Sequence, residues 1–285
     1  MSASNQEDPK SSQPKNKEEF VQEGQSAQPD ISEEGVTFEV VEETIQEGRE
    51  VRHKGVYLLP NLFTTAALFS GFYAIVAAIN GLYEQAAVAI FVSMIFDGLD
   101  GRVARMTHTQ SAFGAEYDSL SDCISFGAAP ALVSYLWALS SLGKIGWMVA
   151  FVYMACAALR LARFNVQLDT ADKRYFTGLP SPSAAAVVAG MVWAGADYGV
   201  EGEKVAVLAA MLTLLAGVMM VSNVKYNSFK EIDLKGRVPF VVILIVVLAF
   251  AVISTDPSRV LLVIFLLYTL SGPAAYFFRR QNRRL

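Results

Sequence analysis

The apolar residues of this chain occur in long runs, and this limits the folds open to it more than any other feature. Hydrophobic residues make up 53% of the 285 positions and charged residues only 18%. An apolar run of about 20 residues crosses the hydrocarbon core of a bilayer as one α-helix. We therefore expect an all-α integral membrane protein, a bundle of about eight transmembrane helices, over residues 58–79, 84–106, 117–140, 145–166, 181–199, 203–222, 238–254 and 258–278.

The first 50 residues differ in composition from the rest. They hold 13 acidic and 4 basic residues, a net charge of −9, whereas the remaining residues have a net charge of +5. Residues 1–30 have almost no aliphatic side chains, so they cannot bury enough surface to offset the entropy lost on ordering. We predict a disordered acidic tail over residues 1–50, with at most a short surface element within 32–50, and a transmembrane domain over 51–285.

Basic residues are distributed unequally between the two sets of helix ends. One set carries 17 Lys and Arg residues, and the other carries three, Lys144, Lys204 and Arg259. Cytoplasmic loops of membrane proteins are enriched in Lys and Arg. We therefore predict that both termini and the segment 97–122 lie at the cytoplasmic face, which agrees with an even number of helices.

Four aspartates interrupt this apolar pattern. Asp97 and Asp100 stand near the end of the second expected helix, and Asp118 and Asp122 stand near the start of the third. The spacing places each pair on one helix face, and two antiparallel helices with a short link can bring the faces together. A carboxylate in a membrane is costly unless something compensates its charge. Oxygen ligands without His or Cys favour Mg²⁺ or Mn²⁺, and two such ions can clamp a diphosphate.

Glycines and arginines accompany the aspartates. We expect Gly98, Gly101 and Gly114 to allow close approach of the two helices. Arg102 and Arg105 lie one helical turn apart, where guanidinium groups can bind phosphate oxygens. Two other interpretations remain: a polar loop with helix caps or solvated ion pairs, and the ion pathway of a cation transporter. Clustering at one membrane face argues against the transporter, whose site is expected near the midplane.

The segment 97–122 resembles the signature of the CDP-alcohol phosphatidyltransferase family without any departure. The pattern is D-x2-D-G-x2-A-R-x8-G-x3-D-x3-D. The resemblance extends over about residues 57–195, where YLLPNLFTTAALFSGF, DSLSDCISFGAAPAL, ALRLARFN and FTGLPSPSAAA are similar to bacterial members that use serine. The eight fixed positions are Asp97, Asp100, Gly101, Ala104, Arg105, Gly114, Asp118 and Asp122.

This resemblance implies a reaction and a setting. The expected reaction transfers a phosphatidyl group from CDP-diacylglycerol to the hydroxyl of L-serine, giving phosphatidylserine and CMP. The family also implies a multi-pass protein of the bacterial plasma membrane, usually a homodimer, with its active site at the cytoplasmic surface and no nucleic-acid partner. The aspartates do not distinguish the alcohol, so glycerol 3-phosphate, inositol and choline remain alternative acceptors.

The resemblance also implies roles for individual residues. Asp97 and Asp118 would bridge two metal ions, and Asp100 would ligate one of them. Asp122 would ligate the other and act as general base, because a positioned carboxylate can take the proton of a serine hydroxyl as it attacks phosphorus. The residues matched to the CDP moiety are Pro60, Asn61, Thr64, Gly101, Arg105 and Ser111.

Two downstream segments have both a structural and a functional interpretation. Arg160, Arg163 and Asn165 in ALRLARFN either anchor the helix at the cytoplasmic face or bind the lipid phosphate or the carboxylate of serine. Residues 176–183, FTGLPSPS, form a loop and a helix start in which Ser181 can cap the next helix, or they line a pocket for the amino acid. The alanine-rich helix that follows predicts close helix packing or a dimer contact.

Overall fold

The computed structural model describes residues 41–46, 49–54, 58–107, 111–167, 175–227 and 240–282. The prediction of a disordered tail falls outside these ranges for residues 1–40. Strands β1 (Val41–Gln46) and β2 (Arg49–Lys54) pair antiparallel within the described part. The predicted domain boundary at residue 50 therefore falls inside β2.

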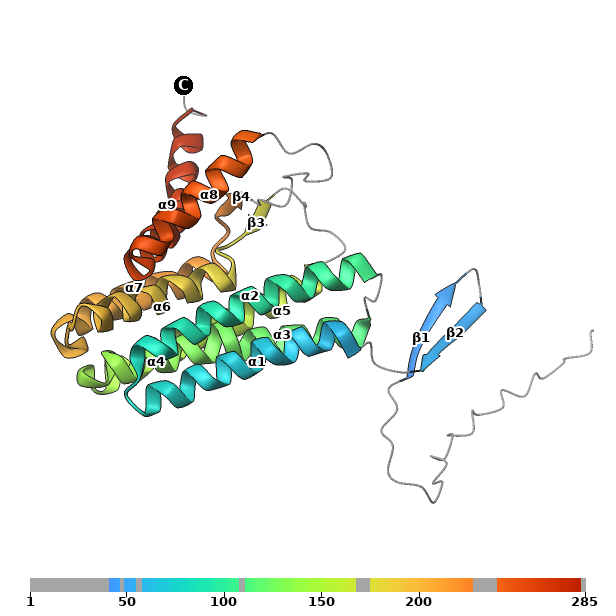
Figure 1. The fold of residues 1–285 in the computed structure, drawn as a ribbon, viewed down its shortest axis with the longest axis horizontal. Coiled ribbons are helices and arrows are strands. Elements are labelled where there is room, and N and C mark those ends of the chain that lie inside the picture. The colour runs from blue at the N-terminus through green and yellow to red at the C-terminus, as the bar shows by residue number, and fades with distance from the viewer. Residues whose placement is uncertain are drawn as a thin grey trace, which may run out of the picture. The chain divides into compact units, whose positions relative to one another are not determined.

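The described residues from 58 onward are mainly helical, and each predicted span has its helix (Figure 1). A π-helix (Cys123–Ala128) joins α3 to α4 without a break, so these three elements form the third predicted helix, which begins at residue 112. The all-α prediction is thus confirmed. The helices are α1 (Leu58–Ile79), α2 (Tyr83–Thr107), α3 (Ala112–Asp122), α4 (Ala129–Trp137), α5 (Lys144–Gln167), α6 (Ser181–Asp197), α7 (Ala206–Val221), α8 (Phe240–Thr255) and α9 (Pro257–Asn282).

Length and composition mark this as a multi-pass membrane protein. Within the described ranges, four helices are long and apolar enough to cross a bilayer, at Asn61–Ile79, Lys144–Val166, Gly202–Val221 and Pro257–Ala275. Helix α2 carries the charges of the aspartate segment, and α6 and α8 have only 17 and 16 residues. Large apolar side chains such as Phe69 and Phe250 are about 70% exposed, as expected of a surface that faces lipid.

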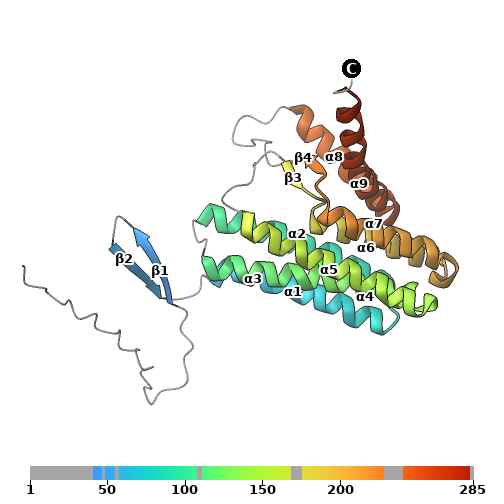
Figure 2. The ribbon, with the colours of Figure 1, turned by 180° about the vertical axis from the view of Figure 1, so that it is seen from behind.

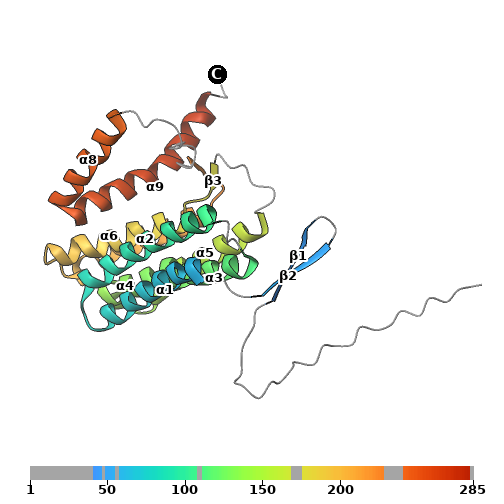
Figure 3. The same ribbon diagram turned by 45° about the vertical axis from the view of Figure 1, so that its right-hand side comes forward.

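Small side chains allow α6 to lie at the centre of the helix packing. Helix α6 contacts α2, α4, α7 and α9, and Figure 3 shows α9 running beside it. Ala184, Ala185, Ala186 and Ala189 are fully buried, because alanine lets neighbouring backbones approach closely. Close helix packing is therefore confirmed for these residues.

Serine hydroxyl groups fix α1 to the helices that carry the aspartates. The Ser93 hydroxyl on α2 donates to the Ala67 carbonyl at 2.8 Å, and the Ser125 hydroxyl in the π-helix donates to the same oxygen at 3.1 Å. The Ser121 hydroxyl donates to the Thr64 carbonyl at 3.2 Å. Such bonds satisfy polar groups where no water is available.

A two-stranded sheet connects the segments before α6 and after α7. Strand β3 (Tyr175–Thr177) pairs antiparallel with β4 (Lys225–Asn227) (Figure 2). Gly178 follows β3 with φ +82°, and its N–H donates to the Val224 carbonyl at 2.8 Å. An added Cβ would lie 2.2 Å from the Met220 carbonyl oxygen, so this position requires glycine.

Candidate active site

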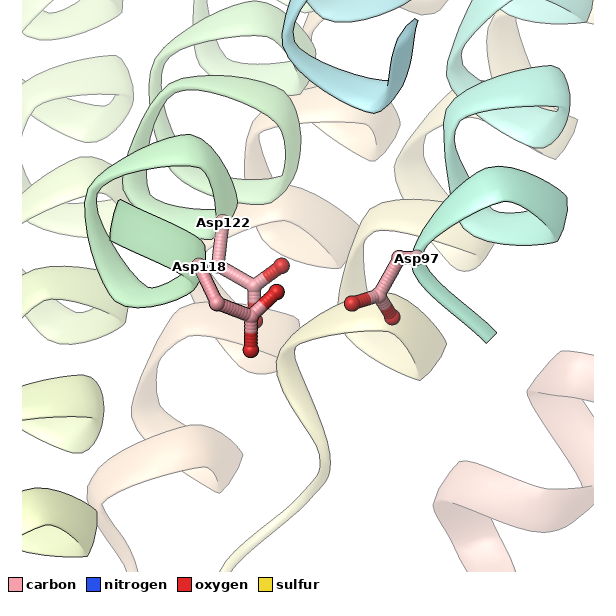
Figure 4. A group of neighbouring side chains, drawn as sticks. All are labelled: Asp97, Asp118 and Asp122. Carbon is pink, nitrogen blue, oxygen red and sulfur yellow. The ribbon is translucent and has the colours of Figure 1, made fainter. Parts of the chain in front are cut away.

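Three of the four predicted aspartates converge between α2 and α3. Asp97 projects from α2 towards Asp118 and Asp122 on α3 (Figure 4). One carboxylate oxygen of each lies within 4.8 Å of the others, and all three side chains are half-buried. Like charges at this separation repel, so the arrangement favours a bound cation.

The donor chemistry of this aspartate cluster fits a hard cation. Its three residues offer only carboxylate oxygens, which Mg²⁺, Mn²⁺ and Ca²⁺ prefer over nitrogen or sulfur ligands. The half-buried position leaves room for substrate oxygens to complete the coordination.

Asp100 has different surroundings. Its side chain is only 6% exposed and accepts a hydrogen bond from the buried Thr64 hydroxyl on α1. Thr64, which the family resemblance assigns to the CDP moiety, therefore contacts a predicted metal ligand directly. This hydrogen bond joins Asp100, on α2, to α1.

Three further residues assigned to CDP lie close to one another or to the start of α3. Ser111 caps α3, because its hydroxyl accepts a hydrogen bond from the Gly114 N–H at 2.9 Å. A Cβ on Gly114 would lie 3.6 Å from the Asn61 carboxamide oxygen. The Asn61 Nδ2 atom is buried and has no hydrogen-bond partner among the described residues, which leaves a donor available to a substrate. Pro60 lies in the first turn of α1.

The expected close approach at two glycines of α2 is wrong. A Cβ added at Gly98 or Gly101 would meet nothing within 4 Å in the described part of the chain, apart from its own helix backbone. The reason is that α2 packs mainly along α1 and α6. Arg102 and Arg105 are also exposed on this helix, so this part of α2 is accessible beside the aspartate cluster.

Arg160 brings a positive charge to the aspartate cluster. Its Nη1 donates to the Ser181 hydroxyl at 2.6 Å, and its charge interacts with those of Asp122 and Asp97. Its Nε atom is buried without a hydrogen-bond partner in the described ranges. A buried guanidinium nitrogen that lacks a protein acceptor is suited to an anionic ligand.

Arg163 and Asn165 have partners in the protein. Arg163 Nη2 donates to the Asn223 carboxamide oxygen at 2.9 Å, and Nη1 lies 3.5 Å from the Val221 carbonyl at the end of α7. A cation is favourable at a helix C-terminus. Asn165 hydrogen-bonds Ser119 on α3. Both contacts connect segments of the bundle, whereas the charge of Arg160 also lies near Asp122 and Asp97.

The predicted helix cap at Ser181 is wrong. Pro180 occupies the N-cap position of α6, and no side chain caps the helix there. Ser181 is the first residue of α6, is fully buried, and accepts the hydrogen bond from Arg160 instead. A guanidinium group in an apolar interior requires acceptors, and this hydroxyl supplies one.

The sequence patterns missed two tyrosines near Arg160. Tyr153 on α5 and Tyr268 on α9 both lie near its guanidinium. The fully buried Tyr153 hydroxyl donates to the Phe126 carbonyl in the π-helix at 3.1 Å. Neither tyrosine belongs to a motif, so only the tertiary structure identifies them.

A family model and several known proteins match the part of the chain that carries the aspartate cluster. The model of the CDP-alcohol phosphatidyltransferase family matches residues 57–222. A CDP-diacylglycerol–serine O-phosphatidyltransferase of Helicobacter pylori is 38% identical over 224 residues, which cover 78% of this chain and 92% of that protein. A protein of the same name from Mycobacterium bovis is 30% identical over 236 residues, 80% of this chain and 82% of that protein. One from Methanocaldococcus jannaschii is 40% identical over 140 residues, 49% of this chain and 62% of that protein.

Proposed function

This chain belongs to the CDP-alcohol phosphatidyltransferase family, and on that premise we propose that it transfers the phosphatidyl group of CDP-diacylglycerol to the hydroxyl of L-serine. The products are phosphatidylserine and CMP. The observation that supports this class of reaction is the convergence of Asp97, Asp118 and Asp122. The relatives named for the serine reaction, which match most of this chain, support the acceptor.

The metal site consists of the four aspartates and takes two Mg²⁺ or Mn²⁺ ions. Asp97 and Asp118 would be shared by both ions, Asp100 would hold one of them, and Asp122 would hold the other. When bound, the ions neutralise charge on the diphosphate and on the leaving CMP. Thr64 supports this arrangement because its hydroxyl orients the Asp100 carboxylate.

Asp122 acts as the general base. It accepts the proton of the serine hydroxyl while the serine oxygen forms a bond to the phosphorus of the phosphatidyl group. The bond from that phosphorus to the oxygen of CMP breaks, and CMP leaves with the electron pair.

Substrate binding uses the residues around the aspartate cluster. Arg160 binds an anionic oxygen, either the carboxylate of serine or the lipid phosphate. Arg163 and Asn165 contribute on the same side through the contacts that hold α5 to α7 and α3. The CDP moiety contacts Pro60, Asn61, Thr64, Gly101, Arg105 and Ser111.

A CMP-release assay tests this function. Protein purified in detergent receives CDP-diacylglycerol and Mg²⁺ or Mn²⁺, with serine, glycerol 3-phosphate, inositol, choline or no acceptor. We expect CMP only with serine, no CMP after chelation of the metal, and recovery when the metal is restored. Equal release with another alcohol would contradict the acceptor, and no release with any alcohol would contradict the reaction.

We also propose the oligomeric state, the membrane and the orientation of the enzyme. It is a homodimer in a bacterial plasma membrane, with the active site and both termini in the cytoplasm. The excess of basic residues at the helix ends near the aspartates supports this orientation.

A further inference from the structure

Two hydroxyl groups join the start of α1 to α3 by hydrogen bonds of defined direction. The Thr65 hydroxyl on α1 donates to the Asn61 carbonyl, one helical turn earlier, at 2.7 Å. The Tyr117 hydroxyl on α3 lies 2.9 Å from the same Thr65 oxygen. A hydroxyl has a single hydrogen to donate, so Thr65 accepts in the second bond and Tyr117 is its donor. The chain of hydrogen bonds therefore runs from Tyr117 through Thr65 to the Asn61 carbonyl.

The ring of Tyr117 is supported by its own helix. It stacks on the Phe113 ring one turn earlier in α3, with the ring centroids 6.0 Å apart and the planes inclined by 18°. Residues four apart are neighbours on a helix surface, and stacked aromatic pairs at this distance are favourable. Tyr117 directly precedes Asp118, so its hydroxyl joins the part of α3 that carries the aspartate cluster to α1.

The end of α1 that Tyr117 reaches carries a free hydrogen-bond donor. Asn61 Nδ2 is buried and has no hydrogen-bond partner within the described segments. The Asn61 carboxamide oxygen lies 3.6 Å from where a Cβ on Gly114 would stand, so α1 and α3 approach closely here. A buried donor without an acceptor costs free energy, and a ligand that supplies an acceptor removes this cost. The position of α1 against α3 thus determines where the free donor lies relative to the aspartates.

Thr64 and Thr65 bond α1 to two different helices. The Thr64 hydroxyl donates to Asp100 on α2, whereas the Thr65 hydroxyl accepts from Tyr117 on α3. Consecutive residues of an α-helix are about 100° apart around its axis, so a single turn of α1 can reach both helices that carry the aspartates. The Tyr117 bond therefore holds this turn on the side of α3.

We propose that Tyr117 is a positioning residue for the nucleotide of the donor substrate: through Thr65 it holds Asn61 where the free Nδ2 donates to an acceptor atom of the CDP group. This inference rests on the proposed function, in which Asn61 contacts CDP. It deepens that function by adding Thr65 and Tyr117, neither of which is a fixed position of the family signature. Because the chain of hydrogen bonds ends at a nucleotide contact, breaking it should affect the CDP-containing substrate and not serine.

Three variants and a matched control test this assignment. Tyr117→Phe keeps the ring and its stacking on Phe113 but removes the donor to Thr65. Thr65→Val removes the hydroxyl and keeps the shape of the side chain, and Thr65→Ser keeps a hydroxyl. Tyr73→Phe is the control, because the Tyr73 hydroxyl on the same helix α1 also bonds a side chain of a neighbouring helix, that of Gln85 on α2, at 3.2 Å.

The measurements are KM for each substrate, kcat, the Kd of CMP in the presence of Mg²⁺, and the melting temperature in detergent. We expect Tyr117→Phe and Thr65→Val each to raise KM for CDP-diacylglycerol and the Kd of CMP about three- to tenfold, as the loss of one neutral hydrogen bond predicts. KM for serine and the melting temperature should stay near wild type, as should every value of Tyr73→Phe. Thr65→Ser should recover most of the loss.

An Asn61→Ala background shows whether Tyr117 acts through Asn61. In that background Tyr117→Phe should raise the Kd of CMP little further, because residues that act on one contact are not additive. An equal increase in both backgrounds would overturn the proposal, and so would unchanged values in Tyr117→Phe and Thr65→Val. A parallel rise of both KM values with a lower melting temperature would show a structural role only.

The affinity for CMP separates this inference from the proposed function, because its measurement needs no acceptor alcohol. If the wild type uses another alcohol instead of serine, the proposed acceptor is wrong, and the Kd of CMP still decides the role of Tyr117.

Discussion

The four aspartates have different surroundings, and these surroundings give them different roles. Asp100 is almost completely buried and is held by the Thr64 hydroxyl. Asp97, Asp118 and Asp122 face one another, and Arg160 places a positive charge near two of them. The positive charge of Arg160 stabilises the ionised carboxylate of Asp122, which is the form that can accept a proton.

Replacement of Asp122 tests its role as base. Asp122→Asn keeps the size of the side chain but removes the proton acceptor, so we expect kcat to fall about 10²–10⁴-fold. CDP-diacylglycerol binding should remain, because the other three aspartates still hold metal. CMP release and direct binding of the lipid measure the two effects separately. Near-normal turnover would place the base elsewhere.

At the scale of helices and strands, local sequence patterns predicted the helices but not every element of secondary structure. Long apolar runs predict helices because a helix satisfies its own backbone groups in lipid, and each predicted span has its helix. The π-helix Cys123–Ala128 and the β3–β4 pair were not predicted. Each depends on partners from other segments, such as the Tyr153 hydroxyl on the Phe126 carbonyl, which no local spacing reveals.

The contact between α1 and the π-helix requires glycine at position 71. A Cβ there would lie 2.8 Å from Ser125 Cα, so Gly71→Ala must separate the two elements. We expect a loss of about 1–3 kcal/mol, seen as a lower melting temperature in detergent. Gly98→Ala is the matched control, because its Cβ meets no described atom outside its own helix within 4 Å. Equal stability of the two variants would show that the contact can relax.

The turn between α8 and α9 predicts a pH-dependent stability. The Tyr198 hydroxyl donates to Asp256 Oδ2 at 2.6 Å and the Arg259 N–H donates to Oδ1 at 3.1 Å. These bonds hold the pKa of Asp256 below its usual range. Because the folded pKa is lower than the unfolded one, the stabilisation is complete above the unfolded value and disappears as pH falls through the folded value.

Melting temperatures of wild type and Asp256→Asn between pH 7 and pH 3 measure this effect. Wild type should melt higher from pH 5 upward, and the difference should shrink below about pH 4. Tyr198→Phe removes the shortest of the hydrogen bonds to Asp256 and should show a smaller pH dependence than wild type. A constant difference across the range would mean that the Asp256 charge does not contribute.

For the whole molecule, the sequence predicted the four aspartates of the site better than it predicted the surroundings of Arg160. The four aspartates lie within one short segment, so helix geometry alone indicated that they could meet. Arg160 was a candidate because it stands with Arg163 and Asn165 in ALRLARFN, on the membrane side expected to carry the aspartates, and because of the family resemblance. Its hydrogen-bond partner could not be predicted, since Ser181 comes from α6 and meets Arg160 only in the folded bundle.

The orientation of the whole bundle gives a last prediction. With 17 basic residues at one set of ends and three at the other, the C-terminus should lie in the cytoplasm and the turn near Gly199 outside it. Green fluorescent protein fused after residue 285 should therefore fluoresce in bacterial cells. Alkaline phosphatase, which is active only outside the cytoplasm, should be active when inserted at Gly199 and inactive after residue 285. The reverse pattern would place the aspartate cluster on the outer face, away from cytoplasmic CDP-diacylglycerol head groups and serine.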